Sequence, residues 1–180
     1  VNIYLDSEIT KEDILDFDFE HICFSTGSLW KKDGVGRVNL HPLDIHKNMN
    51  IFTPDDLLGD KIIHGKIIIF DDDHYYMGSV LAEKLIKNGN EVTFVTPASN
   101  VSEWSLNTLD QPFIQKRLIE LGVEIICNKF ISKVKSNSVE LTCKYTGMTN
   151  DMDTNNLLLV TSRYPLDNLY KSLSNDDVKN

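Results

Sequence analysis

Three consecutive carboxylates, Asp71, Asp72 and Asp73, are the residues whose types and spacing come closest to a chemical site. They directly follow residues 67–70, an apolar run that predicts a buried strand. Residues 78–88 predict a helix that ends at Gly89, with Val80, Leu81 and Leu85 facing inward, and residues 92–95 predict the next strand. Carboxylates at this point of a βαβ unit can bind a divalent cation, or they can repel a phosphate. The surrounding elements indicate which of these two functions applies.

Two metal-dependent chemistries place aspartates at the end of such a strand. A response-regulator receiver domain also needs a phosphoacceptor aspartate after a third strand, where this chain has QKRLIELGV in a helix pattern. A haloacid-dehalogenase-type phosphatase uses a D-x-D motif, which Asp71 and Asp73 match. Tyr75 replaces the usual Thr or Val of that motif, and no later Lys with an acidic pair follows. Both interpretations are therefore disfavoured.

The third interpretation is a dinucleotide-binding turn whose glycine fingerprint has been replaced. Of the pattern G-x-G-x-x-G only the last glycine remains, and the second strand ends in Val95-Thr96-Pro97, without an acid for a ribose. Carboxylates facing a pyrophosphate would repel it by roughly a few kcal/mol. The sequence thus predicts a degenerate phosphate loop that does not bind NAD(P)H, made of Asp71, Asp72, Asp73 and Gly78.

The residues around this loop have plainer interpretations. The acidic run itself is expected to be a solvated loop that partly caps the following helix, in preference to a metal site. His74, Tyr75 and Tyr76 are expected to plug a turn that no longer holds a cofactor. Arg163 follows the last predicted strand and is expected to form a salt bridge or an interface contact. We expect no catalytic residue and no metal ligand in this chain.

Composition and charge exclude several classes of function. The net charge is −9 and the 18 basic residues are scattered, which argues against nucleic acid and against anionic membrane surfaces. The 3 cysteines are far apart, so they cannot supply the four thiolates of an iron–sulfur cluster, and we expect them to be small buried residues. No signal peptide or membrane span is apparent, which predicts a cytoplasmic protein. The chain opens on Val and a strand-like segment, as a piece of a longer protein would.

The order of predicted elements indicates an α/β fold. Thr10 begins a short helix with a capping box, residues 53–58 form a helical turn, and residues 59–65 form a linker. Strands are expected at residues 3–5, 19–25, 123–127, 130–134, 139–145 and 157–160; helices at 108–121 and 167–173; and a polar turn at 147–153. This pattern predicts a three-layer Rossmann-like domain of the FAD/NAD(P)-binding, glutathione-reductase type, with a parallel sheet plus an antiparallel β-meander.

Several segments together resemble a known family. The turn STG, the linker helix TPDDLL, the loop DDDHYYMG and the final stretch NNLLLVTSRYPLDNLY occur in this order. The chain resembles, over nearly all its length, the C-terminal part of the trimethylamine dehydrogenase-like flavoproteins, which include dimethylamine, histamine and dimethylglycine-type demethylating enzymes. Residues 34–50 and 136–153 match this family least.

The resemblance implies a parent enzyme with more domains than this chain. Members carry an N-terminal barrel with FMN, a segment with a 4Fe-4S cluster, and two domains that resemble the FAD and NADPH domains of glutathione reductase. Residues 1–60 would be a partial FAD/ADP-like segment with a linker, and residues 61–180 a vestigial NAD(P)-like Rossmann domain. The implied partners are the barrel and iron–sulfur region of the parent and an electron-transferring flavoprotein.

The resemblance also implies one nucleotide contact outside the acidic loop. Ser25, Thr26 and Gly27 match the small-residue turn that lies near FAD or ADP in the family. The glycine fingerprint of that FAD/ADP-like domain is absent from this chain. We therefore expect no cofactor in the chain itself. The alternative is a domain that still binds ADP, FAD or NAD(P) through other contacts.

Overall fold

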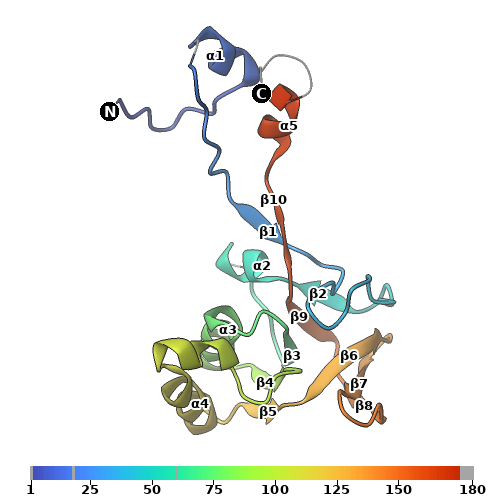
Figure 1. The fold of residues 1–180 in the computed structure, drawn as a ribbon. Coiled ribbons are helices and arrows are strands. Elements are labelled where there is room, and N and C mark those ends of the chain that lie inside the picture. Colours follow the sequence, from blue (N-terminus) through green and yellow to red (C-terminus); the bar gives the residue numbers. More distant parts are fainter. Residues whose placement is uncertain (1, 18, 60, 175–180) are drawn as a thin grey trace. The chain divides into compact units, whose positions relative to one another are not determined.

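The computed structural model describes residues 2–17, 19–59 and 61–174, which form two compact units (Figure 1). One unit consists of residues 30–163. The other consists of the described residues of 1–29 and 164–180. The acidic loop belongs to the larger unit, residues 30–163.

The centre of the larger unit is a five-stranded sheet with the order β2-β9-β3-β4-β5. Every neighbouring pair in this sheet is parallel. The carboxyl ends of the strands therefore meet at one edge of the sheet, as in other open α/β sheets. The strands are β2 (Asn50–Phe52), β3 (Lys66–Asp71), β4 (Glu91–Val95), β5 (Glu124–Ile126) and β9 (Asn156–Val160).

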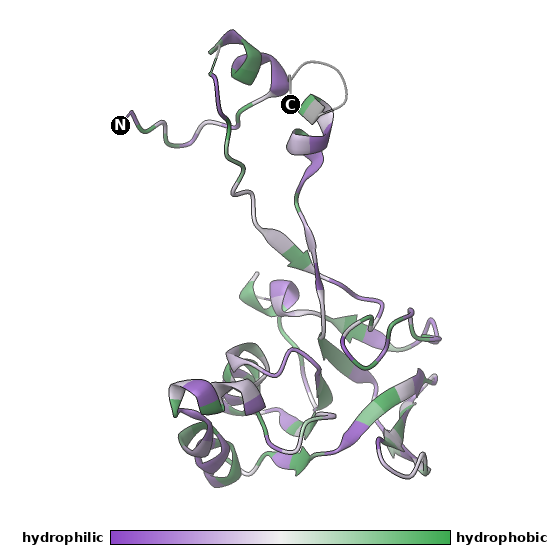
Figure 2. Ribbon diagram, viewed as in Figure 1, coloured by the Kyte–Doolittle hydropathy of each residue, from purple (hydrophilic) through white to green (hydrophobic). Residues whose placement is uncertain are grey.

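Both faces of this sheet are covered by other elements. Side chains alternate along a strand, so Ile67 and Ile69 of β3 join one hydrophobic cluster, and Ile68 and Phe70 join a second. The helices α3 (Tyr76–Lys87) and α4 (Gln111–Glu120) contribute to the first cluster. An antiparallel sheet of β6 (Lys129–Val134), β7 (Ser138–Cys143) and β8 (Thr149–Asp153) contributes to the second. The apolar runs of β3 and β9 follow from this burial on two sides (Figure 2).

Local sequence explains where the helices begin and end. Helix α3 buries Leu81, Ala82 and Leu85 against the sheet and ends before Gly89, whose φ of 82° suits glycine. Helix α4 has Pro in its first turn, and the chain leaves it through Gly122 at φ 78°. The 3₁₀ helix η1 (Glu103–Thr108) precedes α4, and α2 (Pro54–Leu58) precedes β3. The expected helical turn at residues 53–58 is therefore confirmed.

The smaller unit contains the helices α1 (Lys11–Asp16) and α5 (Asn168–Ser174). The expected capping box is present, because the Asp13 amide donates to Thr10 Oγ1 at 3.2 Å and the Thr10 amide donates to Asp13 Oδ2 at 2.9 Å. The strands β1 (Ser28–Trp30) and β10 (Arg163–Pro165) form a two-stranded sheet at the points where the chain passes from one unit to the other.

The predicted fold class, a three-layer Rossmann-like domain of glutathione-reductase type, is wrong. Two of the predicted strands, residues 3–5 and 19–25, have no strand structure, and Ile3 and Leu5 are exposed. The first strand of the parallel sheet is β2, where no strand was predicted. The expected polar turn at 147–153 contains the edge strand β8, whose residues are mostly exposed and therefore polar. Short patterns predict strand character but not strand partners.

The described part of the chain holds no helix that is both long and apolar enough to cross a membrane.

Candidate functional site

The acidic loop lies at the carboxyl edge of the parallel sheet, between β3 and α3. Asp71 is the last residue of β3, and its partner in the sheet is Val160 of β9. This is the position where open α/β sheets bind ligands. The sequence therefore predicted the position of the loop correctly, and its chemistry depends on where the carboxylates point.

The side chain of Asp71 points into the protein interior and is fully buried. The His74 amide donates to its Oδ1 at 3.3 Å, while Oδ2 has no hydrogen-bond partner. Burial raises the pKa of Asp71 to about 7, against the opposing attraction of His74 and the hydrogen bond from its amide. Asp71 is therefore a buried acid that keeps its proton to a higher pH than an exposed carboxyl does.

Asp72 is equally buried but is well satisfied on one oxygen. Its Oδ2 accepts hydrogen bonds from the amides of Arg37, at 2.5 Å, and Val38, at 2.9 Å. A Cβ atom on Gly36 would lie 2.3 Å from the same oxygen, so only glycine allows this close approach. Asp72 thus holds residues 36–38 against the carboxyl edge of the sheet. Its second oxygen lies 3.4 Å from His74 Nε2.

The backbone donors of this turn are also used within the protein. The amides of Asp72 and Asp73 both donate to the Val160 carbonyl, at 2.9 and 3.1 Å, and the His74 amide is the donor to Asp71. The solvated acidic loop that we expected is therefore wrong for Asp71 and Asp72, and only Asp73 is partly exposed. Burial of these two carboxylates is tolerated because each accepts a hydrogen bond from a backbone amide: Asp72 from residues 37 and 38, and Asp71 from His74.

Gly78 fills a packing role in this arrangement. It lies buried in the first turn of α3, where an added Cβ would meet the Asp71 Cγ at 3.0 Å and the Phe94 ring at 3.1 Å. In a dinucleotide turn the last glycine allows close packing of helix on strand. Gly78 allows the same close packing here, with the carboxylate of Asp71 beneath it.

The three residues after the aspartates have different environments. His74 is buried and adopts a left-handed backbone with φ 65°, so it fills the turn as expected. Tyr76 bonds through its hydroxyl to Thr108 Oγ1 at 2.6 Å and Asp110 Oδ2 at 2.9 Å. Tyr75 is exposed, so it does not plug the turn.

The small-residue turn Ser25, Thr26 and Gly27 belongs to the smaller unit. It lines a cavity of about 420 Å³ together with Phe24 and Tyr170. The Thr26 hydroxyl donates to the Leu166 carbonyl, and the Leu166 amide donates to the Gly27 carbonyl at 3.0 Å. These bonds hold the turn open beside the cavity. The two halves of the predicted site therefore lie in different units, and whether either contacts a nucleotide stays a prediction.

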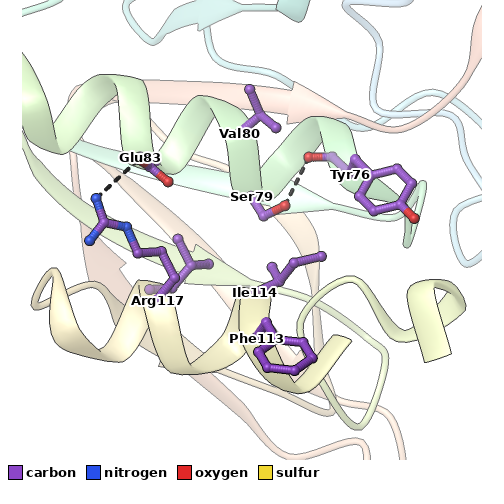
Figure 3. Close-up of a pocket in the computed structure, with 8 residues that line it drawn as sticks. Tyr76, Ser79, Val80, Glu83, Phe113, Ile114 and Arg117 are labelled. Carbon is purple, nitrogen blue, oxygen red and sulfur yellow. Dashed lines mark hydrogen bonds and ion pairs between the residues drawn. The ribbon is translucent and has the colours of Figure 1, made fainter. Parts of the chain in front are cut away.

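A separate groove runs between α3 and α4 (Figure 3). Its walls are mainly apolar, with Val80 from α3 and Phe113 and Ile114 from α4, and its volume is about 280 Å³. The charged residues at one end, Glu83 and Arg117, pair with each other at 3.2 Å. Few polar groups converge on this groove, so it lacks the features of a small-molecule site.

The cysteines do not form a metal-binding set. Cys23 is exposed and Cys127 and Cys143 are half-buried, so the expectation that all three are buried is wrong. Among the residues that the structure describes, no three His, Cys, Asp or Glu side chains are grouped to hold a metal ion. Asp71 and Asp72 accept hydrogen bonds from backbone amides, and Asp73 pairs with Arg163.

Comparison with protein families gives a match over residues 52–155 to the OYE-like second alpha/beta domain. The chain belongs to this family. The matched region begins at the end of β2 and continues to the loop before β9, so it contains the acidic loop, α3, α4 and the antiparallel sheet. This match replaces the glutathione-reductase-type assignment.

Named relatives agree with this family. The chain is 27% identical to the dimethylamine dehydrogenase of Hyphomicrobium sp. (strain x), over 92% of this chain and 25% of that protein. It superposes on histamine dehydrogenase from Rhizobium sp. 4-9 with a TM-score of 0.90 and 40% identity, covering 94% of this chain and 26% of that one. It superposes on the 6-hydroxypseudooxynicotine amine oxidase of Pseudomonas geniculata N1 with a TM-score of 0.92 and 33% identity, covering 98% and 27%.

These findings confirm the resemblance to the trimethylamine dehydrogenase-like enzymes. The chain spans about a quarter of the length of the relatives it matches. It is therefore similar to one region of larger oxidoreductases.

Sequence reasoning missed the partners that close the acidic loop. Asp72 contacts two segments that are far away along the chain. Its carboxylate lies against Gly36 and accepts from the Arg37 amide, and its own amide donates to the Val160 carbonyl. The segment KKDGVGR held the only local signal, since two glycines so close together mark a tight backbone approach. The sequence does not say which side chain they approach.

Proposed function

We propose that this chain is the C-terminal nucleotide-binding-like module of an amine-oxidising flavin and iron–sulfur oxidoreductase, and that its phosphate turn no longer takes NAD(P)H. The observation that carries the proposal is the closed turn, in which the Asp72 and Asp73 amides are bound to the Val160 carbonyl. A pyrophosphate needs such amides free. Asp71 and Asp72 occupy the space beneath them, fully buried.

The amine substrate is inferred for the parent from the relatives. Their names specify dimethylamine, histamine and an amine of the pseudooxynicotine type. The parent's FMN and 4Fe-4S cluster would lie outside these residues, because the chain's 3 scattered cysteines cannot supply a cluster's four thiolates. The module would pack against the N-terminal barrel and iron–sulfur region of a cytoplasmic enzyme that passes electrons to an electron-transferring flavoprotein.

A second candidate function is retained nucleotide binding at the other predicted site. The cavity beside Ser25, Thr26 and Gly27, of about 420 Å³, favours it, since its size suits part of an ADP or FAD molecule. In the parent this turn would contact ADP or FAD, and the phosphates would be held by residues outside this chain. We therefore expect weak binding at most from the chain alone.

Calorimetry on the 180-residue chain tests both candidates. Titration with NADH, NADPH, ADP and FAD should give no saturable heat. Micromolar binding of NADH or NADPH would contradict the closed phosphate turn. Micromolar binding of ADP or FAD that Ser25→Trp abolishes, by filling the cavity at the small-residue turn, would support the second candidate instead. Circular dichroism of each protein confirms that it is folded.

A further inference from the structure

A second cavity of the larger unit collects an unusual set of side chains. Both tryptophans of the chain, Trp30 and Trp104, line it, and so do two of its three arginines, Arg37 and Arg163. Trp30 and Arg37 lie near each other along the chain, Trp104 and Arg163 lie far from them, and all four are within residues 30–163. The cavity has a volume of about 390 Å³. Its size is at the lower end of small-molecule sites, which span roughly 300 to 1,000 Å³.

Each arginine in the cavity is stacked on one of the tryptophans. The Arg37 guanidinium lies 4.0 Å from the centre of the Trp104 ring, and the Arg163 guanidinium lies 4.6 Å from that of Trp30. Stacking holds a guanidinium flat and leaves its N–H edges free to bind a carboxylate. The main chain of Arg37 is fixed as well, because its amide donates to the buried Asp72.

The charge of the cavity is positive although the protein is strongly acidic. Asp73 is the one carboxylate that lines it, and Asp73 Oδ1 lies 3.5 Å from an Arg163 guanidinium nitrogen. The two guanidinium charges therefore exceed the one carboxylate. Tyr76 and Met77, at the start of α3, also line the cavity, and no acidic side chain lies in the first turn of that helix. The helix dipole adds positive potential there.

We propose that this cavity binds a small aromatic carboxylate. The carboxylate would pair with Arg37 and Arg163, and the ring would lie against Trp104 and the exposed Tyr75. Arg37 suits this role because no carboxylate partner is found for it among the residues that the structure describes. A dinucleotide is too large for about 390 Å³, and the amides that would bind its phosphates are already used. This site goes beyond the proposed function and does not depend on it.

Binding of benzoate, a small aromatic carboxylate, tests the proposal. Benzamide has the same ring without the charge, and cyclohexanecarboxylate has the charge without the aromatic ring. Calorimetry on the full chain should show saturable benzoate binding, with benzamide and cyclohexanecarboxylate each about tenfold weaker. Because both tryptophans line the cavity, their fluorescence should change with the same midpoint. Added salt should weaken benzoate binding.

Variants locate the binding. Arg37→Gln and Arg163→Gln should each weaken benzoate about tenfold. Arg117→Gln is the matched control, since Arg117 is also half-exposed but pairs with Glu83 outside this cavity, and it should leave the affinity unchanged. Absence of saturable benzoate binding, equal binding of benzamide, or indifference to both cavity variants would overturn the proposal. None of these results would affect the closed phosphate turn, which the nucleotide titrations test separately.

Discussion

At the residue scale, Asp71 and Asp72 show how neighbouring carboxylates acquire different roles. Asp72 accepts two backbone hydrogen bonds that hold residues 36–38. Asp71 has one long hydrogen bond and one oxygen without a partner. An ionised carboxylate in that position is costly, because one long hydrogen bond replaces only part of its lost hydration. The protein therefore favours the protonated form of Asp71.

This difference predicts how stability depends on pH. The pKa of Asp71 is raised to about 7 in the folded protein, above its ordinary value of 3.8. The folded state therefore binds more protons than the unfolded state between these values. The contribution of Asp71 to the free energy of unfolding is fully present below the lower value and is lost as pH rises through about 7. Within this window the slope reaches roughly 1.4 kcal/mol per pH unit.

Asp71→Asn should remove this loss, because the neutral amide keeps the acceptor for His74. Urea denaturation at several pH values should show the variant gaining stability over wild type as pH rises from 4 to 7. Asp153→Asn, on the exposed edge strand β8, serves as the control and should follow the wild-type profile. A constant difference between Asp71→Asn and wild type across the range would show that Asp71 does not titrate in this window.

At the element scale, helix α3 shows that apolar spacing predicts the buried face of a helix only in part. Its apolar spacing predicted an inward face, and Leu81 and Leu85 are buried as expected. Val80 was also expected to face inward, and it is 58% exposed. One residue of rotation on a helix changes direction by about 100°, so neighbouring apolar residues cannot both face the sheet. Val80 instead lines the groove beside α4 (Figure 3).

The two neighbours Leu81 and Val80 provide a matched test of this orientation. Leu81→Ala should lower the free energy of unfolding by about 2 to 5 kcal/mol, because it leaves a cavity in the cluster between α3 and the sheet. Val80→Ala should change it by about 0.5 kcal/mol or less. Urea denaturation of both variants measures the difference. Equal effects would mean that α3 is rotated relative to the sheet.

Strands were predicted less well than helices, for a physical reason. A helix satisfies its own backbone, whereas a strand needs a partner that the local sequence does not specify. The apolar runs of β3, β4 and β9 are long enough to indicate burial on both faces, and they were found close to their true bounds. The edge strands β2 and β8 were missed, because β2 is short and β8 is largely polar and exposed.

At the scale of the whole molecule, the hydrophobic core is confined to one unit. Both clusters, one on each face of the parallel sheet, consist only of residues between 30 and 163. In the other unit Ile14 and Leu173 are buried, while Ile3, Tyr4 and Phe19 are exposed. The chain spans about a quarter of its relatives, and exposed apolar residues are expected where further parts of a parent protein would pack.

We therefore predict that residues 30–163 fold without the rest of the chain. Such a fragment should unfold cooperatively in urea with a midpoint close to that of the full chain, as followed by circular dichroism. A fragment of residues 30–155 is the control, because it lacks β9, which lies between β2 and β3 in the sheet. That control should not fold. Loss of structure in the 30–163 fragment would contradict the assignment of the core to this unit.

The sequence by itself determined the βαβ unit around residues 66–95, the helices closed by Gly89 and Gly122, and the likeness to the trimethylamine dehydrogenase-like enzymes. These features depend on the local periodicity of apolar residues, on helices that end at a glycine and on the order of short motifs. Only the tertiary structure decided which of the aspartates are buried and what they bind. The amides of Arg37 and Val38 bind the Asp72 carboxylate, and the Val160 carbonyl accepts from the amides of the turn and so closes it. A carboxylate is solvated or buried according to the hydrogen-bond donors that the fold brings to it. The donors to Asp72 lie 34 and 35 residues away along the chain, so the local sequence does not reveal them.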